Sequence, residues 1–209
     1  MRYKGHIIKG RPVDNAGHVR EGDVFICLEG ARHDGHRFIP EACRLGASLI
    51  VSEKKITGCP VRCLRVKNAR VCLAELSNLY YRNPSRKLSL VGITGTNGKT
   101  TISYLIRNML KSAGIESSLI GTNAHYIGTT KIVSANTTPG HLDINKILRE
   151  SLRWGIREGV MEVSSHALIQ NRIGGIEFKY RIFSNNTLDI TFVELNRGTE
   201  VKALVKTVD

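Results

Sequence analysis

Short apolar runs alternate with helix-spaced apolar positions along most of the chain. The apolar runs have the length of strands and lie at residues 24–28, 49–51, 90–93, 160–163 and 180–183. Between them, apolar residues recur at helical spacing and predict helices at 40–45, 69–81, 102–110 and 142–154. Strands that alternate with helices predict an α/β fold with a mostly parallel sheet, whose ligands bind beyond the carboxyl ends of the strands.

Weaker signals complete this pattern. Residues 63–66 alternate like an edge strand, a hairpin is expected around Gly128, and a loop or short helix is expected at 166–172. Residues 81–87 are polar and contain Pro84, which suits a linker. We therefore expect two domains, a small α/β domain over 1–84 and a second, phosphate-loop domain over 85–209.

A phosphate-binding loop is the strongest functional signal. The apolar run 90–93 leads into Gly-Thr-Asn-Gly-Lys-Thr-Thr at 95–101 and then into a predicted helix. Backbone N–H groups in such a glycine turn and at the start of the next helix converge on one anion. Lys99 is placed to reach the β- and γ-phosphates, and the Thr100 hydroxyl to bind Mg²⁺. The strict Walker pattern has glycine where this chain has Ile93, so the sequence predicts a variant nucleotide-triphosphate loop.

Two further polar clusters are candidates for the same site. Glu162 interrupts the apolar run 160–163, where a buried carboxylate needs a partner, either a Mg²⁺ ion held by a triphosphate or an arginine. The Ser164-Ser165-His166 that follows favours the ion. Residues 136–139 (Asn-Thr-Thr-Pro) offer an amide and two hydroxyls before a predicted helix, which favours ligand contact over a simple N-terminal cap. Asp34-Gly35-His36 predicts a turn.

Composition and charge narrow the class of protein. The net charge is +13, which fits phosphorylated ligands, nucleic acid or an anionic surface equally well. The basic residues are scattered, so nucleic-acid binding is the weaker expectation. No run reaches the length of a membrane span and no apolar leader follows Met1, which predicts a cytoplasmic protein. The five cysteines lack metal-ligand spacing and are expected to be reduced and mostly buried.

Three motifs, in this order and spacing, resemble the Mur ligases of peptidoglycan synthesis: GTNGKTT at 95–101, NTTP at 136–139 and MEVSSHAL at 161–168. Within that family they look like the MurE type, which adds meso-diaminopimelate or L-lysine to UDP-N-acetylmuramoyl-L-alanyl-D-glutamate. Residues 22–25 (GDVF) and 30–39 (GARHDGHRFI) are similar to the UDP-sugar-binding N-terminal domain of that type. GTNGKTT alone is shared with folylpolyglutamate-type ligases, whereas NTTP together with MEVSSHAL is highly specific.

The resemblance implies a ligase that uses ATP and Mg²⁺ to phosphorylate the terminal carboxylate of its substrate, after which an amine attacks the acyl phosphate. It implies that Lys99, Glu162 and His166 serve catalysis, with Thr100 and Glu162 at the metal. The residues it implies in ATP binding are Gly95, Thr96, Asn97, Gly98, Lys99, Thr100 and Thr101. The residues it implies in contact with the UDP-muramoyl-dipeptide are Asn136, Thr137, Thr138, Ser164, Gln170 and Arg172.

The chain also departs from the family pattern. Asp14-Asn15-Ala16 stands where the family has Asp-Ser-Arg near the uracil site, and Gly140 replaces a commonly acidic residue. Asn186-Thr187-Leu188-Asp189 lacks the family's Asp-His, and only Lys202 or Lys206 lies near the expected position of its carbamylated lysine.

The family's remaining central strands and its C-terminal domain have no counterpart here, so the resemblance implies a truncated ligase with an exposed sheet edge. The alternatives are a non-catalytic ATP- and UDP-sugar-binding module, half of a split ligase completed by a partner chain, or a basic nucleic-acid-binding protein.

Overall fold

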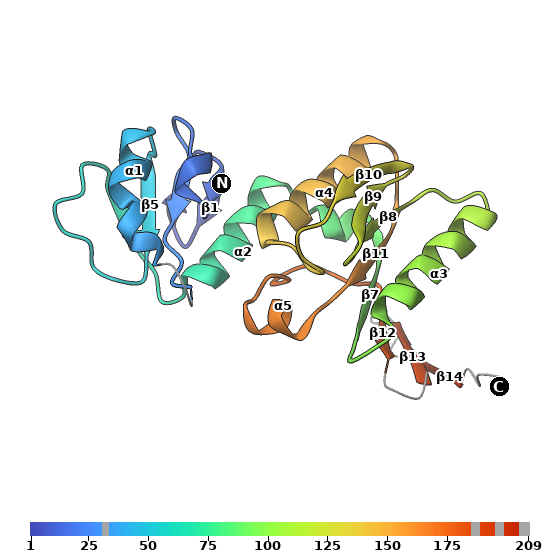
Figure 1. Cartoon of the computed structure of the whole chain (residues 1–209). Coiled ribbons are helices and arrows are strands. Elements are labelled where there is room, and N and C mark those ends of the chain that lie inside the picture. The colour runs from blue at the N-terminus through green and yellow to red at the C-terminus, as the bar shows by residue number, and fades with distance from the viewer. Residues whose placement is uncertain (31–33, 185–188, 195–198, 205–209) are drawn as a thin grey trace. The chain divides into compact units, whose positions relative to one another are not determined.

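The computed structural model describes residues 1–30, 34–184, 189–194 and 199–204, and the side chains as far as Tyr180 with the exception of Arg2. These residues form two compact units, Met1–Arg82 and Asn83–Asp209 (Figure 1). Among the described residues, none of the helices is both long and apolar enough to cross a membrane.

The first unit is built on a parallel four-stranded sheet with the order β3-β4-β5-β6. Its strands are β3 (Pro12–Val13), β4 (Val24–Ile26), β5 (Leu49–Ser52) and β6 (Arg62–Arg65), preceded by the hairpin β1 (Arg2–Tyr3) and β2 (His6–Ile7). Its helices are α1 (Ile39–Arg44), α2 (Ala69–Tyr80) and the 3-10 turns η1 (Ala16–His18) and η2 (Gly35–Phe38). The predicted edge strand at 63–66 is confirmed, because β6 ends this sheet.

The second unit contains an eight-stranded sheet with the order β10-β9-β8-β11-β7-β12-β13-β14. The central strands β8 (Ser117–Ile120), β11 (Glu158–Glu162), β7 (Ser89–Gly95) and β12 (Tyr180–Ser184) are parallel. The outer strands β9 (Ala124–Ile127), β10 (Thr130–Val133), β13 (Asp189–Glu194) and β14 (Thr199–Leu204) pair antiparallel with their neighbours. The predicted hairpin around Gly128 is therefore confirmed as β9–β10, and the α/β fold class is also confirmed.

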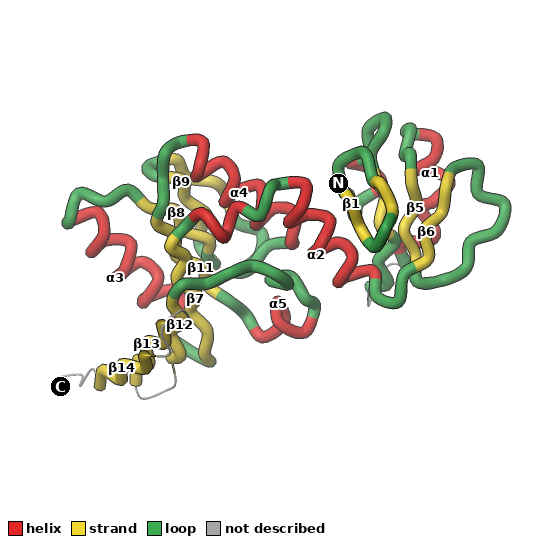
Figure 2. The backbone as a smooth tube through the Cα atoms, turned by 180° about the vertical axis from the view of Figure 1, so that it is seen from behind, coloured by secondary structure: helices red, strands yellow, loops and turns green. Residues whose placement is uncertain are grey.

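Helices lie on both faces of this second sheet. The helix α3 (Lys99–Ser112) covers one face, and α4 (His141–Arg153) covers the other (Figures 1 and 2). Successive side chains of a strand point to opposite faces of the sheet, so each strand contributes to both cores. Met161 packs in the core beneath α4, whereas Val160 packs beneath α3. Glu162, two residues after Val160, thus belongs to the face that α3 covers. The helix α4 is followed by the exposed Trp154, whose Nε1 donates to Glu150.

The division between the two units falls within the polar stretch at 81–87, between Arg82 and Asn83. Pro84–Lys87 is a 3-10 turn, η3, and both Pro84 and Ser85 are buried. The Ser85 hydroxyl accepts the backbone N–H of Glu177 at 3.1 Å, which ties this turn to the segment before β12. The second half of this stretch is therefore folded and packed within the second unit.

Candidate functional site

The loop between β7 and α3 has the backbone that its sequence predicts. Gly95, the last residue of β7, has φ 140°, and Gly98, which immediately precedes α3, has φ 78°. Both values lie in the region that favours glycine, so these two residues allow the chain to turn tightly into the helix. Lys99 curls back over the loop, and its Nζ donates to the carbonyl oxygens of Gly95 at 2.7 Å and Thr96 at 3.3 Å. The lysine ammonium therefore lies over the loop that would surround a phosphate.

The carboxylate of Glu162 lies beside this loop, fully buried at the end of β11. Its Oε2 accepts hydrogen bonds from the hydroxyls of Thr100 at 2.9 Å and Thr122 at 2.7 Å. Its Oε1 accepts the hydroxyl of Ser103 at 3.0 Å and the backbone N–H of Thr122 at 3.3 Å. No lysine or arginine among the described side chains pairs with Glu162. The arginine alternative is thus wrong for this part of the chain, and neutral donors alone surround a buried carboxylate.

A third group of residues joins the ends of β11 and α4. The Thr138 hydroxyl donates to the backbone oxygen of Glu162 at 2.8 Å and accepts the N–H of Ser164 at 3.0 Å. Arg172 donates from Nη1 to the carbonyl oxygen of Thr138 at 2.7 Å, and from Nε and Nη2 to Gln170. The Thr137 hydroxyl lies 3.1 Å from the Thr122 hydroxyl, which donates to Glu162 and can accept from Thr137. The structure thus brings five of the six predicted substrate residues into one hydrogen-bonded network around the end of β11.

Asn136 is the sixth predicted substrate residue. Its side chain is exposed at the rim of a cavity of about 370 Å³ that is also lined by Pro139, His125 and Asp143. The alternative reading of this segment as the cap of the following helix is wrong, because Gly140 occupies the N-cap of α4 and no side chain caps it.

His166 lies near the start of α5 (Ser165–Ile169), where the Ser164 side chain caps the helix. The imidazole is exposed, and its side chain makes no hydrogen bond or ion pair with any residue that the structure describes. Its catalytic role stays a prediction. Thr101 and Asn97 are also exposed, on α3 and on the loop before it. Asn186, Thr187, Leu188 and Lys206 lie outside the described residues, as does the side chain of Lys202.

Sequence reasoning missed three residues of this site. Thr122 follows β8 and gives Glu162 both its hydroxyl and its backbone N–H. Ser103 lies one turn along α3 from Thr100, so both hydroxyls face the same carboxylate. Gly121 makes the close approach possible, because a Cβ there would lie 2.4 Å from Glu162 Oε1. A Gly-Thr pair directly after a buried parallel strand is the signal that could have identified Thr122 and Gly121.

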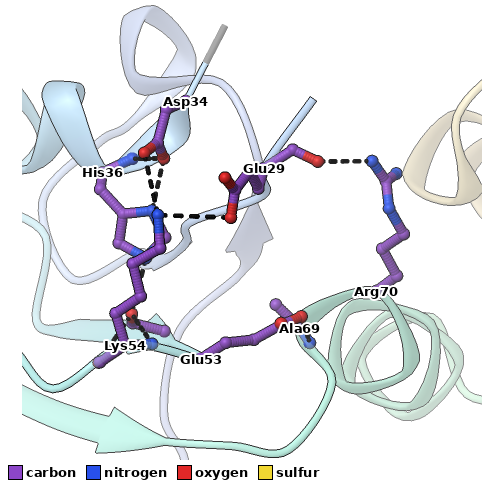
Figure 3. Close-up of polar contacts among 8 residues, drawn as sticks. Glu29, Asp34, His36, Glu53, Lys54, Ala69 and Arg70 are labelled. Carbon is purple, nitrogen blue, oxygen red and sulfur yellow. Dashed lines mark hydrogen bonds and ion pairs between the residues drawn. The ribbon is translucent and has the colours of Figure 1, made fainter. Parts of the chain in front are cut away.

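The Asp34-Gly35-His36 turn of the first unit is held by a separate polar cluster (Figure 3). Asp34 caps η2 by accepting the backbone N–H of His36, and its carboxylate also contacts the His36 ring and Lys54 Nζ. These donors, the backbone N–H first, hold the pKa of Asp34 well below its usual range. His36 Nε2 lies 2.7 Å from the hydroxyl of the buried Ser52. The predicted turn is confirmed, and it is fixed against the end of β5.

Asn15 has a local structural partner. Its Oδ1 accepts the N–H of Gly17 at 3.0 Å and caps η1. The Ala16 side chain is buried in the core of the first unit.

Known proteins match both units. The family model of the Mur ligase middle domain matches residues 93–189, and the model described as "Mur ligase family, catalytic domain" matches residues 15–81. Two relatives are named UDP-N-acetylmuramoyl-L-alanyl-D-glutamate--2,6-diaminopimelate ligase: one from Clostridium botulinum, 42% identical over 177 residues, and one from Listeria monocytogenes, 40% identical over 172 residues. Each match covers 82% of this chain but only 36% and 35% of the relative. The chain thus spans about a third of the length of the curated relatives it matches.

A solved structure of a protein with the same ligase name has a similar fold. Its TM-score is 0.72 at 24% identity, and the match covers 88% of this chain and 38% of that one.

Proposed function

The chain belongs to the Mur ligase family, and from that premise we propose that it carries the ATP site and part of the substrate site of a ligase that adds diaminopimelate to UDP-N-acetylmuramoyl-L-alanyl-D-glutamate. The curated relatives carry this activity in their names. ATP would phosphorylate the terminal carboxylate of the muramoyl dipeptide and leave as ADP. The amine would then attack the acyl carbon of this acyl phosphate, form the amide bond and displace phosphate. We propose that it takes place in the cytoplasm, where ATP is available.

The buried carboxylate of Glu162 carries this proposal. A carboxylate that is removed from water keeps its charge at a high cost unless a cation compensates it. Hydroxyls and one amide N–H are its partners among the described side chains. A cation that arrives with a ligand would complete the site, and the neighbouring phosphate loop indicates which ligand brings it.

The donor atoms of the site fit Mg²⁺. Thr100 and Glu162 offer oxygen only, which is what this ion prefers, and Mg²⁺ commonly takes one or two protein oxygens together with the phosphates of its substrate. We assign Thr100 and Glu162 as the residues that hold it. When bound, the ion would offset the negative charge on the transferring phosphoryl group.

Lys99 and the loop would bind the phosphates. The Lys99 ammonium is already held over the loop by carbonyl oxygens of Gly95 and Thr96, so phosphate oxygens can replace these acceptors without a large movement. The backbone of residues 95–101 would add N–H donors at the start of α3.

We assign the neighbouring network to the substrate. Arg172 is the only charged member of the group Asn136, Thr137, Thr138, Ser164, Gln170 and Arg172, and would attract the carboxylates of the muramoyl dipeptide. Thr138 and Ser164 are hydrogen-bonded directly at the end of β11, so a substrate held there would lie beside Glu162 and the phosphates. We propose that the first unit binds the UDP part.

Calorimetric titration with ATP tests the ATP site. We expect Lys99→Ala to weaken binding about 10- to 100-fold, the loss expected for a charge-assisted hydrogen bond. Glu162→Gln should keep weak ATP binding but remove its dependence on Mg²⁺. Lys111→Ala is the control, because Lys111 is an exposed lysine at the other end of α3. ATP affinity that is equal in the wild type and in Lys99→Ala would refute the proposed site.

Turnover separates this proposal from its alternatives. The assay contains ATP, Mg²⁺, the UDP-muramoyl dipeptide and either diaminopimelate or lysine. Phosphate release that requires both other substrates supports ligation. ATP binding without release supports a binding module or half of a split ligase. Salt-sensitive DNA binding that ATP leaves unchanged would instead indicate a nucleic-acid-binding protein.

A further inference from the structure

Cysteines that are far apart in the sequence gather at one corner of the first unit. Cys43 Sγ and Cys59 Sγ lie 3.9 Å apart. The Cys63 thiol lies near Cys59, and its Sγ donates to the carbonyl oxygen of Val61 at 3.5 Å. Cys43 and Cys59 are half-buried, Cys63 is exposed, and Cys72 is buried elsewhere, on α2. Of the five thiols, only those of Cys27 and Cys72 are buried, so the expectation of mostly buried thiols is wrong. The sulfurs of Cys43 and Cys59 are in non-bonded contact.

The three thiols come from three different elements. Cys43 is on α1, Cys63 is on β6, and Cys59 lies in the loop that joins β5 to β6. This loop has room to adjust next to Cys59, because a Cβ on Gly58 would meet no atom within 4 Å. A bond between the sulfurs needs them to approach to about 2.05 Å, which rotation of the side chains and a small loop shift can supply.

We propose that Cys43 and Cys59 form a site of oxidative modification, at which a peroxide produces a reversible disulfide between α1 and the β5–β6 loop. In the first step one thiol and hydrogen peroxide give a sulfenic acid and water. In the second step the other thiol attacks the sulfenic sulfur, the S–S bond forms, and a second water leaves. Two thiols lose two electrons and two protons, and one peroxide is reduced to two waters. A dithiol reductant reverses the bond by exchange.

The acidity of the thiols sets the conditions of this reaction. Burial, followed by the hydrogen bond with Cys59, raises the pKa of Cys43, and burial raises the pKa of Cys63 to about 11. The thiolate is the reactive form, so Cys43 and Cys63 react slowly at neutral pH. The modification therefore requires sustained exposure to peroxide.

The bond would act on the core of the first unit. Cys43, Cys59 and Ile56 pack against the same core cluster that contains Ala16 and Val13. A disulfide would fix the loop to α1 over this cluster and restrict the unfolded chain, since it closes a loop between residues 16 positions apart. The oxidised chain should therefore resist heat better than the reduced chain.

The test uses the full chain, incubated with hydrogen peroxide, alkylated and mapped by mass spectrometry. We expect the free thiols to fall from five to three, a peptide that links Cys43 to Cys59, and a higher unfolding midpoint that a reductant reverses. Cys43→Ser and Cys59→Ser should each abolish the linked peptide and the shift, whereas Cys63→Ser and Cys72→Ser should retain both. Cys43→Ala and Cys59→Ala replace the serine variants if those fail to fold by circular dichroism.

Four results would overturn the proposal. The first is five free thiols after exposure. The second is a Cys59–Cys63 link that forms equally well in Cys43→Ser. The third is a disulfide between two chains through the exposed Cys63, visible as a dimer on a non-reducing gel. Tightly bound zinc in the untreated chain would also overturn it, because the thiols would then serve a metal.

Discussion

At the scale of single residues, the environment of Glu162 depends on the absence of a side chain at Gly121. The backbone of residues 121 and 122 passes so close to the carboxylate that an alanine Cβ would lie 2.4 Å from Oε1. A contact of this length requires the carboxylate or the strand end to move. The geometry of the proposed metal ligand is therefore fixed by a neighbouring glycine as much as by its own hydrogen bonds.

We expect Gly121→Ala to weaken Mg²⁺-dependent ATP binding and to destabilise the chain by about 1–3 kcal/mol, as overpacking usually does. Gly17→Ala is the matched control, because the added Cβ would meet only Asn15 Oδ1 at 3.4 Å. Titration with ATP and urea unfolding measure the two effects. Normal affinity together with normal stability in Gly121→Ala would show that the carboxylate is free to move.

His125 makes stability depend on pH. Burial lowers its pKa below the ordinary value of 6.5, and its Nδ1 lies 3.3 Å from the N–H of Gly121. As the pH falls through 6.5, the unfolded chain binds a proton that the folded imidazole does not, so the unfolding free energy falls until the lower folded pKa is reached.

We expect the stability advantage of the wild type over His125→Gln to be largest at pH 8 and to shrink by pH 5.5. Urea unfolding followed by circular dichroism at both pH values measures it. An advantage of the same size at both values would contradict the assigned cause.

Individual site residues were predictable where a local motif surrounds them. Lys99 and Thr100 stand in a glycine loop that can be read without any structure, and Glu162 was identified because a carboxylate interrupts an apolar run. Thr122 and Ser103 were not found, because their role depends on which strand and helix face Glu162. That information lies in the pairing of β8 with β11 and in the orientation of α3, neither of which follows from local spacing.

At the scale of elements, α2 shows how a single side chain determines where a helix begins. Asn68 precedes the helix with extended backbone, and its Oδ1 accepts the N–H of Val71 at 2.9 Å. This bond satisfies one of the N–H groups that the first turn leaves without a partner.

Asn68→Ala should therefore lower the unfolding free energy by about 1 kcal/mol. Asn68→Asp should keep most of the stabilisation that the cap provides, because aspartate also accepts this N–H. Urea unfolding of both variants gives the comparison. An equal loss in both would indicate that contacts other than the cap determine the stability of α2.

The same local signals explain which elements the sequence predicted. The predicted helix at 69–81 is α2, and the predicted run at 160–163 lies over β11, with differences of one or two residues at the ends. Periodicity is sufficient for such segments. The strands β13 and β14 were not predicted, because their residues follow the end of the recognisable motifs. The antiparallel pairing of β13 with β12, and of β14 with β13, is a tertiary property.

At the scale of the whole molecule, each unit has a hydrophobic core of its own. The clusters around Phe25 and Ile50 lie within the first unit, and those around Met161 and Ile93 lie within the second. A ligand that binds only the folded second unit should therefore stabilise that unit and leave the other unchanged.

Calorimetric unfolding should show two transitions, of which MgATP raises only one. At a concentration of 100 times its dissociation constant, the ligand adds about 2.7 kcal/mol to the unit that binds it. Lys99→Ala should abolish this shift. A single transition, or a shift of both, would show that the units unfold together.

Trp154 is an intrinsic fluorescence probe of the second unit. It is the single tryptophan of the sequence, and it follows α4 within the second unit. Its emission therefore reports the unfolding of the second unit alone, while the tyrosines Tyr3, Tyr80 and Tyr81 belong to the first. Exciting tryptophan selectively at its red edge and comparing the result with circular dichroism can separate the two melting curves without any added dye or mutation.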